Sequence, residues 1–149
     1  MVRVVIGSDH AGFRLKGTIK VLLDRMGIAY EDVGTATAAS ADYPDFAEAA
    51  ARAVLDGRAD RGILVCGTGI GMSIAANKIP GIRAALAWNE ATARLGRSHN
   101  DANILALGGR TTPAGAAEGI VHAFLFTEYE DGRHDARLAK VAQLERKDS

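Results

Sequence analysis

The sequence predicts a single α/β domain over residues 1–149: a three-layer, Rossmann-like, doubly wound fold with a five-stranded parallel sheet and a C-terminal helix. Two observations lead to this prediction. Short segments rich in branched apolar residues alternate with longer amphipathic segments along the chain, which is the order of a parallel sheet with right-handed crossover helices. The 149 residues also suit one domain and are enough to bury a core.

The first half of the chain begins this alternation. Val2–Ile6 (VRVVI) is rich in β-branched side chains and predicts a strand, and Ala11–Met26 carries apolar residues close to helical spacing. A short second strand is predicted at Ala29–Val33. The alanine-rich segment Asp45–Asp56 predicts the second helix, because Pro44 suits the first turn of a helix.

The second half repeats the pattern on both sides of a glycine-rich stretch. Ile63–Cys66 predicts a buried parallel strand, and the residues from Met72 onward predict a helix. The fourth strand is predicted at Ile82–Trp88 (IRAALAW) and is followed by a helix at Glu90–Ser98. The fifth strand, Ile104–Leu107, ends at a double glycine.

Two further helices are predicted at the C-terminal end of the chain. Pro113–Thr127 is mostly apolar, whereas Asp135–Lys147 is a charged, amphipathic tail helix. No repeat, low-complexity tract or linker interrupts the order, so we expect no second domain.

The composition excludes several classes of protein. Hydrophobic residues make up 48% of the chain and 18 Lys and Arg balance 18 Asp and Glu, which predicts neither disorder nor a nucleic-acid-binding surface. The single cysteine excludes an intrachain disulfide, and no Cys/His group has zinc-site spacing. The first residues lack the pattern of a signal peptide, and no apolar stretch reaches the roughly 20 residues of a membrane span. We therefore expect a soluble cytoplasmic protein.

The glycine-rich stretch CGTGIG is the strongest candidate for a ligand site. Gly67, Gly69 and Gly71 allow the backbone to approach a ligand, and the amides at a helix start point outward with the positive end of the helix dipole. A positive helix end favours the thiolate form of a nearby cysteine, so Cys66 is a candidate base or nucleophile. The alternative is that Cys66 is a small core residue and that the glycines only form a tight turn.

Nucleotide-binding motifs do not fit this chain. The dinucleotide fingerprint needs a glycine where Met72 stands, and it belongs after the first strand, where the sequence reads GSDHAG. The phosphate-binding loop of nucleotide hydrolases needs Gly-Lys-Ser/Thr, but Gly7–Arg14 ends in Gly-Phe-Arg. We therefore expect no nucleotide cofactor.

Polar residues gather where a doubly wound sheet binds its ligands, outside the carboxyl ends of the strands. They are Ser8, Asp9 and His10 after the first strand, Cys66 and Thr68 after the third, and Arg110 after the fifth. His99 and Asn100 precede the fifth strand instead, so the sheet rule alone does not place them in the same crevice.

Six motifs, in order and over nearly the whole chain, resemble the type B ribose-5-phosphate isomerases, a metal-independent family that includes the galactose-6-phosphate isomerase subunits. The motifs are GSDHAGF (7–13), DYPDFA (42–47), CGTGIGMSIAANK (66–78), GIRAAL (81–86), HNDAN (99–103) and GRHDAR (132–137). The resemblance implies an aldose-ketose isomerase that interconverts ribose 5-phosphate and ribulose 5-phosphate through a cis-enediolate.

The resemblance also implies roles for individual residues. One branch of the family uses a cysteine at the position of Cys66 as the base, whereas another uses a glutamate where this chain has Met72, so the chain is similar to the cysteine branch. His99 matches the residue that opens the sugar ring. Thr68 is expected to supply a hydroxyl to the reacting oxygens or to orient the base. The backbone of the glycine loop is expected to stabilise the enediolate, through Gly67, Gly69, Ile70 and Gly71.

The remaining matches concern substrate binding and assembly. Asp9, His10 and Asn100 match sugar-phosphate contacts. Arg133 and Arg137 are four residues apart on the predicted tail helix and can grip one phosphate together, with Arg110 as a third member. Family members assemble the site between two subunits, which implies a homodimer or homotetramer here, with no metal and no cofactor.

Each of these roles has a structural alternative. The two tail arginines suit a solvated helix face, Asp9 suits a helix cap, and His10 and His99 suit the surface. We expect His122 and His134 to have packing roles. The closest functional alternatives are the same chemistry on a tetrose or hexose phosphate, and a subunit that binds a sugar phosphate or a partner without catalysis.

Overall fold

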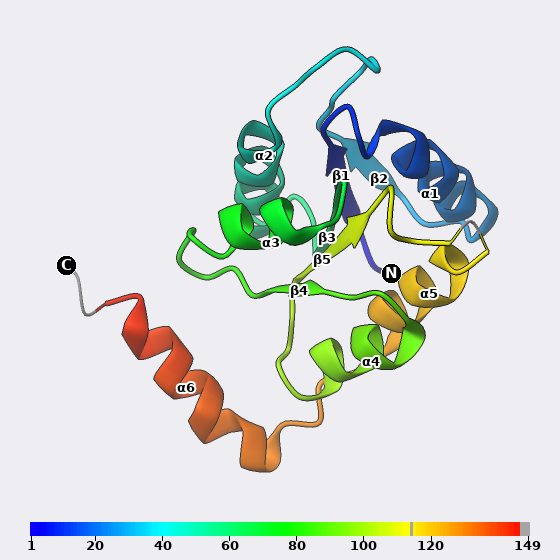
Figure 1. The fold of residues 1–149 in the computed structure, drawn as a ribbon. Coiled ribbons are helices and arrows are strands. Elements are labelled where there is room, and N and C mark those ends of the chain that lie inside the picture. The colour runs from blue at the N-terminus through cyan, green and yellow to red at the C-terminus, as the bar shows by residue number, and fades with distance from the viewer. Residues whose placement is uncertain (114, 147–149) are drawn as a thin grey trace.

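A five-stranded parallel sheet with the strand order β2-β1-β3-β5-β4 forms the centre of the molecule (Figure 1). The computed structural model describes residues 1–113 and 115–146. The strands are β1 (Val4–Ser8), β2 (Tyr30–Asp32), β3 (Arg61–Cys66), β4 (Ala84–Leu86) and β5 (Ile104–Gly108). From β1 the chain passes to β2 on one side of β1, and it then crosses over to form β3 on the other side. This reversal puts the topological switch point between β1 and β3.

Helices cover both faces of the sheet, as the three-layer prediction requires. The helices are α1 (Phe13–Arg25), α2 (Tyr43–Leu55), α3 (Ile70–Ala76), α4 (Glu90–Ser98), α5 (Ala117–Phe126) and α6 (Asp135–Leu144), with a single 3-10 turn, η1 (Gly132–His134), before α6. One core cluster joins α1, α4 and α5 to one face, and the other joins α2 and α3 to the opposite face. The predicted doubly wound fold is confirmed.

The helix α2 contributes mainly alanines to the core on its face of the sheet, whereas the helices on the other face contribute many larger side chains. On the α2 and α3 face, the alanines of α2 and Met72 pack against Leu64 and Ala106 of the sheet. On the α1, α4 and α5 face, larger residues such as Ile19 and Phe124 fill the space. The alanine-rich sequence of α2 therefore lets this helix approach the sheet closely, beside the carboxyl end of β3.

Several predicted boundaries shift in the structure. The first strand is Val4–Ser8 instead of Val2–Ile6, because parallel pairing with β2 and β3 begins at Val4. β4 keeps only Ala84–Leu86 of the predicted strand, since it is an edge strand that pairs with β5 alone.

The helix boundaries shift as well. α2 begins at Tyr43, with Pro44 in its first turn as predicted, and α3 begins at Ile70 rather than Met72. α5 begins at Ala117 instead of Pro113, because the residues after β5 turn back to bond Gly108. Ala114 in the predicted helix 113–127 and Lys147 at the end of the tail helix lie outside the described residues.

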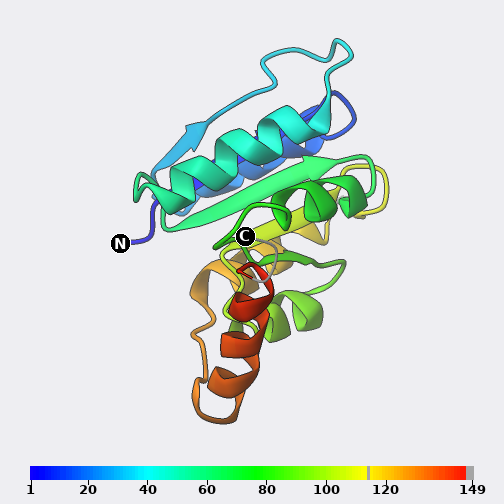
Figure 2. The same ribbon diagram turned by 90° about the vertical axis from the view of Figure 1, so that its left-hand side faces the viewer.

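The tail helix α6 projects away from the three-layer body of the domain (Figures 1 and 2). None of its residues is buried, and Val141 and Leu144 are 45% and 61% exposed. An open cleft of about 630 Å³ separates α6 from the body, with Leu138, Val141 and Leu144 on one wall and Ile82 and Ala84 among the residues of the other. The apolar stripe predicted for this helix therefore meets an open cleft and not a packed core.

Within residues 1–113 and 115–146, none of the helices combines the length and the apolar character that crossing a bilayer requires.

Candidate functional site

The glycine loop follows β3 directly and begins at the buried Cys66, which is 4% exposed. The Gly69 amide donates a hydrogen bond to the Cys66 sulfur at 3.2 Å. Gly69 has a φ of +80°, in the left-handed region that favours glycine, and this turn aims its amide back at the sulfur. An amide donor at this position stabilises negative charge on the sulfur.

The rest of the loop exposes backbone and a hydroxyl to the same edge of the sheet. Thr68 is exposed, and its hydroxyl oxygen accepts a hydrogen bond from the Ile70 amide at 3.2 Å. Gly71 faces the Tyr43 ring so closely that a Cβ at Gly71 would lie 2.7 Å from two ring carbons. Tyr43 therefore borders the loop, and glycine at position 71 is what makes room for its ring.

The end of β1 brings Asp9 and His10 beside this loop. Asp9 is buried, and its Oδ1 accepts a hydrogen bond from the Gly12 amide at 3.0 Å, just before α1. α1 has Gly12 as its N-cap and no side-chain cap hydrogen bond, so this contact fixes the turn before the helix and is not the cap that the structural alternative expects of Asp9. His10 is exposed, and its Nδ1 lies 3.2 Å from the amide nitrogen of Ala41, in the segment between β2 and α2.

Arg110 reaches the same place from the end of β5. The Gly109 and Arg110 amides donate hydrogen bonds to the carbonyls of Cys66 and Gly67, at 2.7 and 2.9 Å, which ties this turn to the glycine loop. The guanidinium lies against Gly67, so that a Cβ added at Gly67 would lie 3.3 Å from Arg110 Nη1. Arg110 and His10 line one hollow of about 490 Å³. The predicted group after β1, β3 and β5 is thus brought together.

A second group of predicted residues lies at the opposite edge of the sheet, where the strands begin. His99 caps the C-terminus of α4, and its ring stacks on the ring of His134 with 4.5 Å between centroids. Asn100 follows His99 and is exposed. Arg133 and Arg137 are both exposed. Arg133 lies in η1, ahead of α6, whose first residue, Asp135, is also the first residue of the predicted tail helix, so the prediction that both arginines lie on that helix is wrong.

The strand register shows how far apart the two groups are within one chain. Gly62 pairs with Ile104 and Cys66 with Gly108, so β5 begins at the edge near His99 and ends at the edge near Cys66. At about 3.3 Å per residue, these four steps of strand separate the two edges by about 13 Å. Within one chain, the two groups therefore lie at opposite ends of the same strand.

His134 belongs to the His99 group, although the sequence predicted no site role for it. It is 6% exposed, in agreement with the packing role predicted for it. Burial and the nearby charge of Arg133 lower the pKa of His134, which favours its neutral form. His122, by contrast, is exposed on α5 and packs against Phe126. The position of His134 in GRHDAR, between the two arginines, was the available signal.

Tyr129 joins the same group through Asp135. Its hydroxyl donates a hydrogen bond of 2.6 Å to the Asp135 carboxylate, and its ring centroid lies 6.5 Å from that of His134. Desolvation of the hydroxyl and the bond to Asp135 raise the pKa of Tyr129 to about 12. The hydroxyl therefore remains a donor at neutral pH and fixes the start of α6 beside His134.

Among the described residues, His99, Glu130 and His134 each place a possible metal-ligand atom within 4.8 Å of the others. The two imidazole rings are stacked and only 23° from parallel, so their in-plane lone pairs run side by side instead of converging on one ion. Two nitrogens bound to one zinc ion at about 2.1 Å each must point toward the same spot. The arrangement suits ring stacking better than chelation, and the absence of a metal stays a prediction.

Replacement of Gly69 by Ala is expected to destabilise the protein by about 2–5 kcal/mol, from the left-handed backbone and from overpacking. The added Cβ would lie 2.6 Å from Leu86 Cδ1 and 2.9 Å from the carbonyl carbon of Leu107. Gly17→Ala is the matched control: no atom lies within 4 Å of its added Cβ, and it lies inside α1, where alanine is favoured. Urea unfolding measures the free energy of unfolding of both variants. Equal midpoints for the two variants would contradict the close packing of Gly69.

Comparison with known proteins agrees with this architecture. Residues 4–141 match the ribose/galactose isomerase family. The chain is 44% identical to ribose-5-phosphate isomerase B of Escherichia coli over 147 residues, covering 99% of each chain. It is 40% identical to a D-erythrulose-4-phosphate isomerase of Pectobacterium atrosepticum, covering 97% of this chain and 96% of the relative.

A solved structure extends the similarity to three dimensions. Ribose-5-phosphate isomerase B of Clostridium thermocellum superposes with a TM-score of 0.97 at 50% sequence identity, and the match covers 99% of both chains. The sheet order, the two helical layers and the sequence match over nearly the whole length all lead to one assignment. The chain belongs to the ribose/galactose isomerase family.

Proposed function

We propose that this protein is an aldose-ketose isomerase that interconverts D-ribose 5-phosphate and D-ribulose 5-phosphate, with Cys66 as the base. The observation that carries the proposal is the bond of 3.2 Å from the Gly69 amide to the Cys66 sulfur, at the switch point of a sheet whose family is the ribose/galactose isomerases. A thiolate supported in this way can take a proton from a carbon next to a carbonyl.

The reaction needs one proton to move between neighbouring carbons. The Cys66 thiolate removes the C2 proton of open-chain ribose 5-phosphate and returns it to C1, while the hydroxyl proton of O2 moves to O1. Negative charge develops on these two oxygens in the enediolate. The exposed Thr68 and the loop from Gly67 to Gly71 supply a hydroxyl and backbone amides at the same edge, which would stabilise that charge.

Ring opening is assigned to His99. The furanose form of ribose 5-phosphate must gain a proton at its ring oxygen and lose one from the anomeric hydroxyl, and an imidazole can do both near neutral pH. His99 is half-buried and stacked on His134, which limits the orientations of its ring. Asn100 is its neighbour and is proposed to contact the sugar.

Both edges of the sheet can serve one sugar only if two copies of the chain contribute to each site. We therefore propose a homodimer, or a homotetramer built from such dimers, in which His99, Asn100, Arg133 and Arg137 of one copy meet Cys66, Asp9, His10 and Arg110 of the other. The exposed apolar residues Val141 and Leu144 support this proposal, because α6 borders an open cleft and, among residues 1–113 and 115–146, buries none of its own residues. The arginines would then bind the phosphate.

The nearest second candidate is the same chemistry on a sugar of different length. The D-erythrulose-4-phosphate isomerase among the relatives favours this alternative, since its name gives a four-carbon substrate. The glycine loop addresses the reacting end that all these sugars share, whereas the distance to the arginines selects their length.

A panel of ribose 5-phosphate, erythrose 4-phosphate, allose 6-phosphate and galactose 6-phosphate tests the proposal with chelator-treated protein. We expect kcat/KM for ribose 5-phosphate to exceed that for each other sugar by at least about tenfold, a difference of about 1.4 kcal/mol in transition-state binding. A higher value for another sugar would keep the mechanism and change the substrate. No turnover of any sugar would reject isomerase activity and favour a binding subunit.

A further inference from the structure

Asp101 ends the turn that carries His99 and Asn100, in a backbone conformation that side chains rarely adopt. Its φ is +48°, a left-handed value that aspartate tolerates better than most residues. The Asp101 and Ala102 amides donate hydrogen bonds back to the carbonyls of Arg97 and Gly96 in α4, at 3.1 and 3.0 Å. The left-handed backbone of Asp101 therefore helps to set the direction in which the chain leaves α4, and with it the placement of His99 and Asn100.

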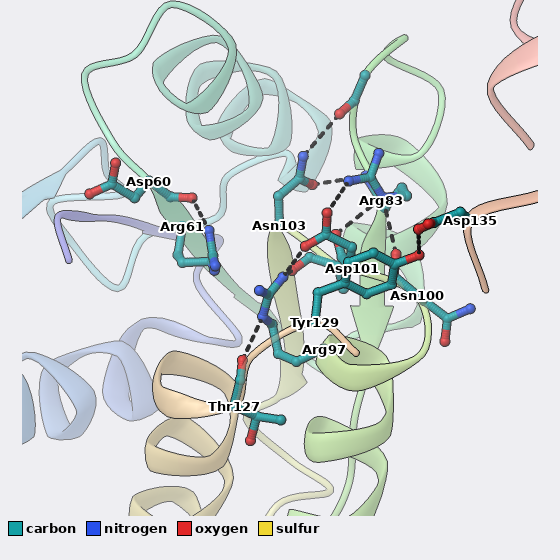
Figure 3. A network of polar contacts seen from close by, with 12 residues as sticks. Asp60, Arg61, Arg83, Arg97, Asn100, Asp101, Asn103, Thr127, Tyr129 and Asp135 are labelled. Atoms are coloured by element: carbon teal, nitrogen blue, oxygen red, sulfur yellow. Dashed lines mark hydrogen bonds and ion pairs between the residues drawn. The ribbon is translucent and has the colours of Figure 1, made fainter. Parts of the chain in front are cut away.

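The Asp101 carboxylate bridges two arginines from different elements (Figure 3). Its Oδ1 accepts a hydrogen bond from Arg97 Nη1 at 2.8 Å, and its Oδ2 accepts one from Arg83 Nη2 at 3.2 Å. The Arg97 side chain belongs to α4 and is 4% exposed, whereas Arg83 lies just before β4. Asp101 thus links α4 to the edge strand of the sheet.

The two arginines also hold the carbonyl groups around the turn. Arg83 Nε lies 3.1 Å from the carbonyl oxygens of both Asn100 and Asp101. Arg97 donates to the carbonyls of Ala102 and Thr127, at 2.8 and 3.2 Å, and the second of these lies beyond α5. The turn is therefore fixed at consecutive carbonyls, and the Asp101 carboxylate is what orients both guanidinium groups.

We propose that Asp101 is a positioning residue for His99 and Asn100 and that Arg83 and Arg97 act through it. This proposal rests on the function proposed above. The Asp101 carboxylate is occupied by the two arginines, so it acts on the sugar only through the backbone of its two neighbours. His134 limits the His99 ring from the other side by stacking, which leaves the backbone turn as the second support of that ring.

The test separates ring opening from proton transfer at carbon. Ribulose 5-phosphate cannot close a five-membered ring, because its O5 carries the phosphate, so exchange of its C1 hydrogen with D2O at saturating substrate needs the Cys66 base but no ring opening. Net conversion of ribose 5-phosphate needs both ring opening and proton transfer at carbon. Asp101→Asn keeps the size of the side chain and its tolerance of a left-handed backbone, but it turns an amide NH2 toward one of the two arginines.

We expect Asp101→Asn to lower net conversion of ribose 5-phosphate by about 10-fold to 100-fold, as misplacement of a supported catalytic group does. Deuterium exchange into C1 of saturating ribulose 5-phosphate, followed by NMR, should stay within about threefold of the wild-type rate. Asp60→Asn is the matched control, because Asp60 pairs with Arg3 and not with Arg83 or Arg97. It should leave both rates unchanged.

Arg83→Gln provides a second measurement if Asp101→Asn does not fold, since Arg83 is partly exposed and lies just before the outer strand β4. The same selective loss of net conversion would support the proposal. An equal loss of both rates would show a merely structural role, and unchanged rates would show no role, so either result overturns it. An inactive wild-type protein would instead reject the proposed function itself, which keeps the two failures distinguishable.

Discussion

Cys66→Ala is expected to lower kcat for ribose 5-phosphate by about 10³-fold to 10⁴-fold and to leave the fold intact. The substitution removes the proposed base and the acceptor of the Gly69 amide, but it removes only one buried sulfur atom from the core. The cost in stability should therefore be about 1–2 kcal/mol. Steady-state kinetics and urea unfolding of the same preparation measure the two effects.

Met72→Leu is the matched control for this experiment. Met72 is fully buried in the same core cluster as Cys66, and leucine has nearly its volume, so activity should stay within about threefold of wild type. It also tests whether position 72, where the family resemblance implies a glutamate in another branch, contributes to proton transfer here. A Cys66→Ala protein that keeps more than about a tenth of wild-type kcat would exclude the thiol as the base.

The fold and one half of the site could be predicted because both follow from local patterns. The glycine loop after β3 needs only an apolar strand and alternating glycines, and Asp9, His10 and Arg110 follow their strands directly. Since carboxyl ends of parallel strands meet at one edge, sequence order alone brings these residues together. Element boundaries depend on contacts beyond the local pattern, as at Pro113, where a turn replaces the predicted helix start.

The supports of the second half could not be predicted in the same way. The stacking of His99 on His134 joins residues 35 positions apart through the loop before α6, and no periodicity indicates such a contact. The sequence gives only a weak indication of the role of Asp101. This residue lies four positions after Arg97, which is the spacing of a helical ion pair, and it follows the end of a predicted helix. Its second partner, Arg83, comes from another element, and only the three-dimensional structure identifies it.

Mixing two inactive variants is expected to restore activity if each site takes its two halves from different copies of the chain. Cys66→Ala damages one edge of the sheet and His99→Asn the other, and about 13 Å of strand separates these edges within a chain. In a mixed dimer, one site receives both damaged halves and the other receives two intact halves. Random exchange of subunits makes half of the dimers mixed, so about one quarter of wild-type activity should return.

Cys66→Ala mixed with Thr68→Val is the matched control, because both substitutions lie in the same loop and no mixed dimer contains an intact site. This mixture should show only the average of its two parents. The measurement is turnover of ribose 5-phosphate after the variants have been unfolded together and refolded. If Cys66→Ala and His99→Asn also gave only their average, each site would belong to one chain. The edge that carries His99 and the arginines would then have no part in the reaction at Cys66.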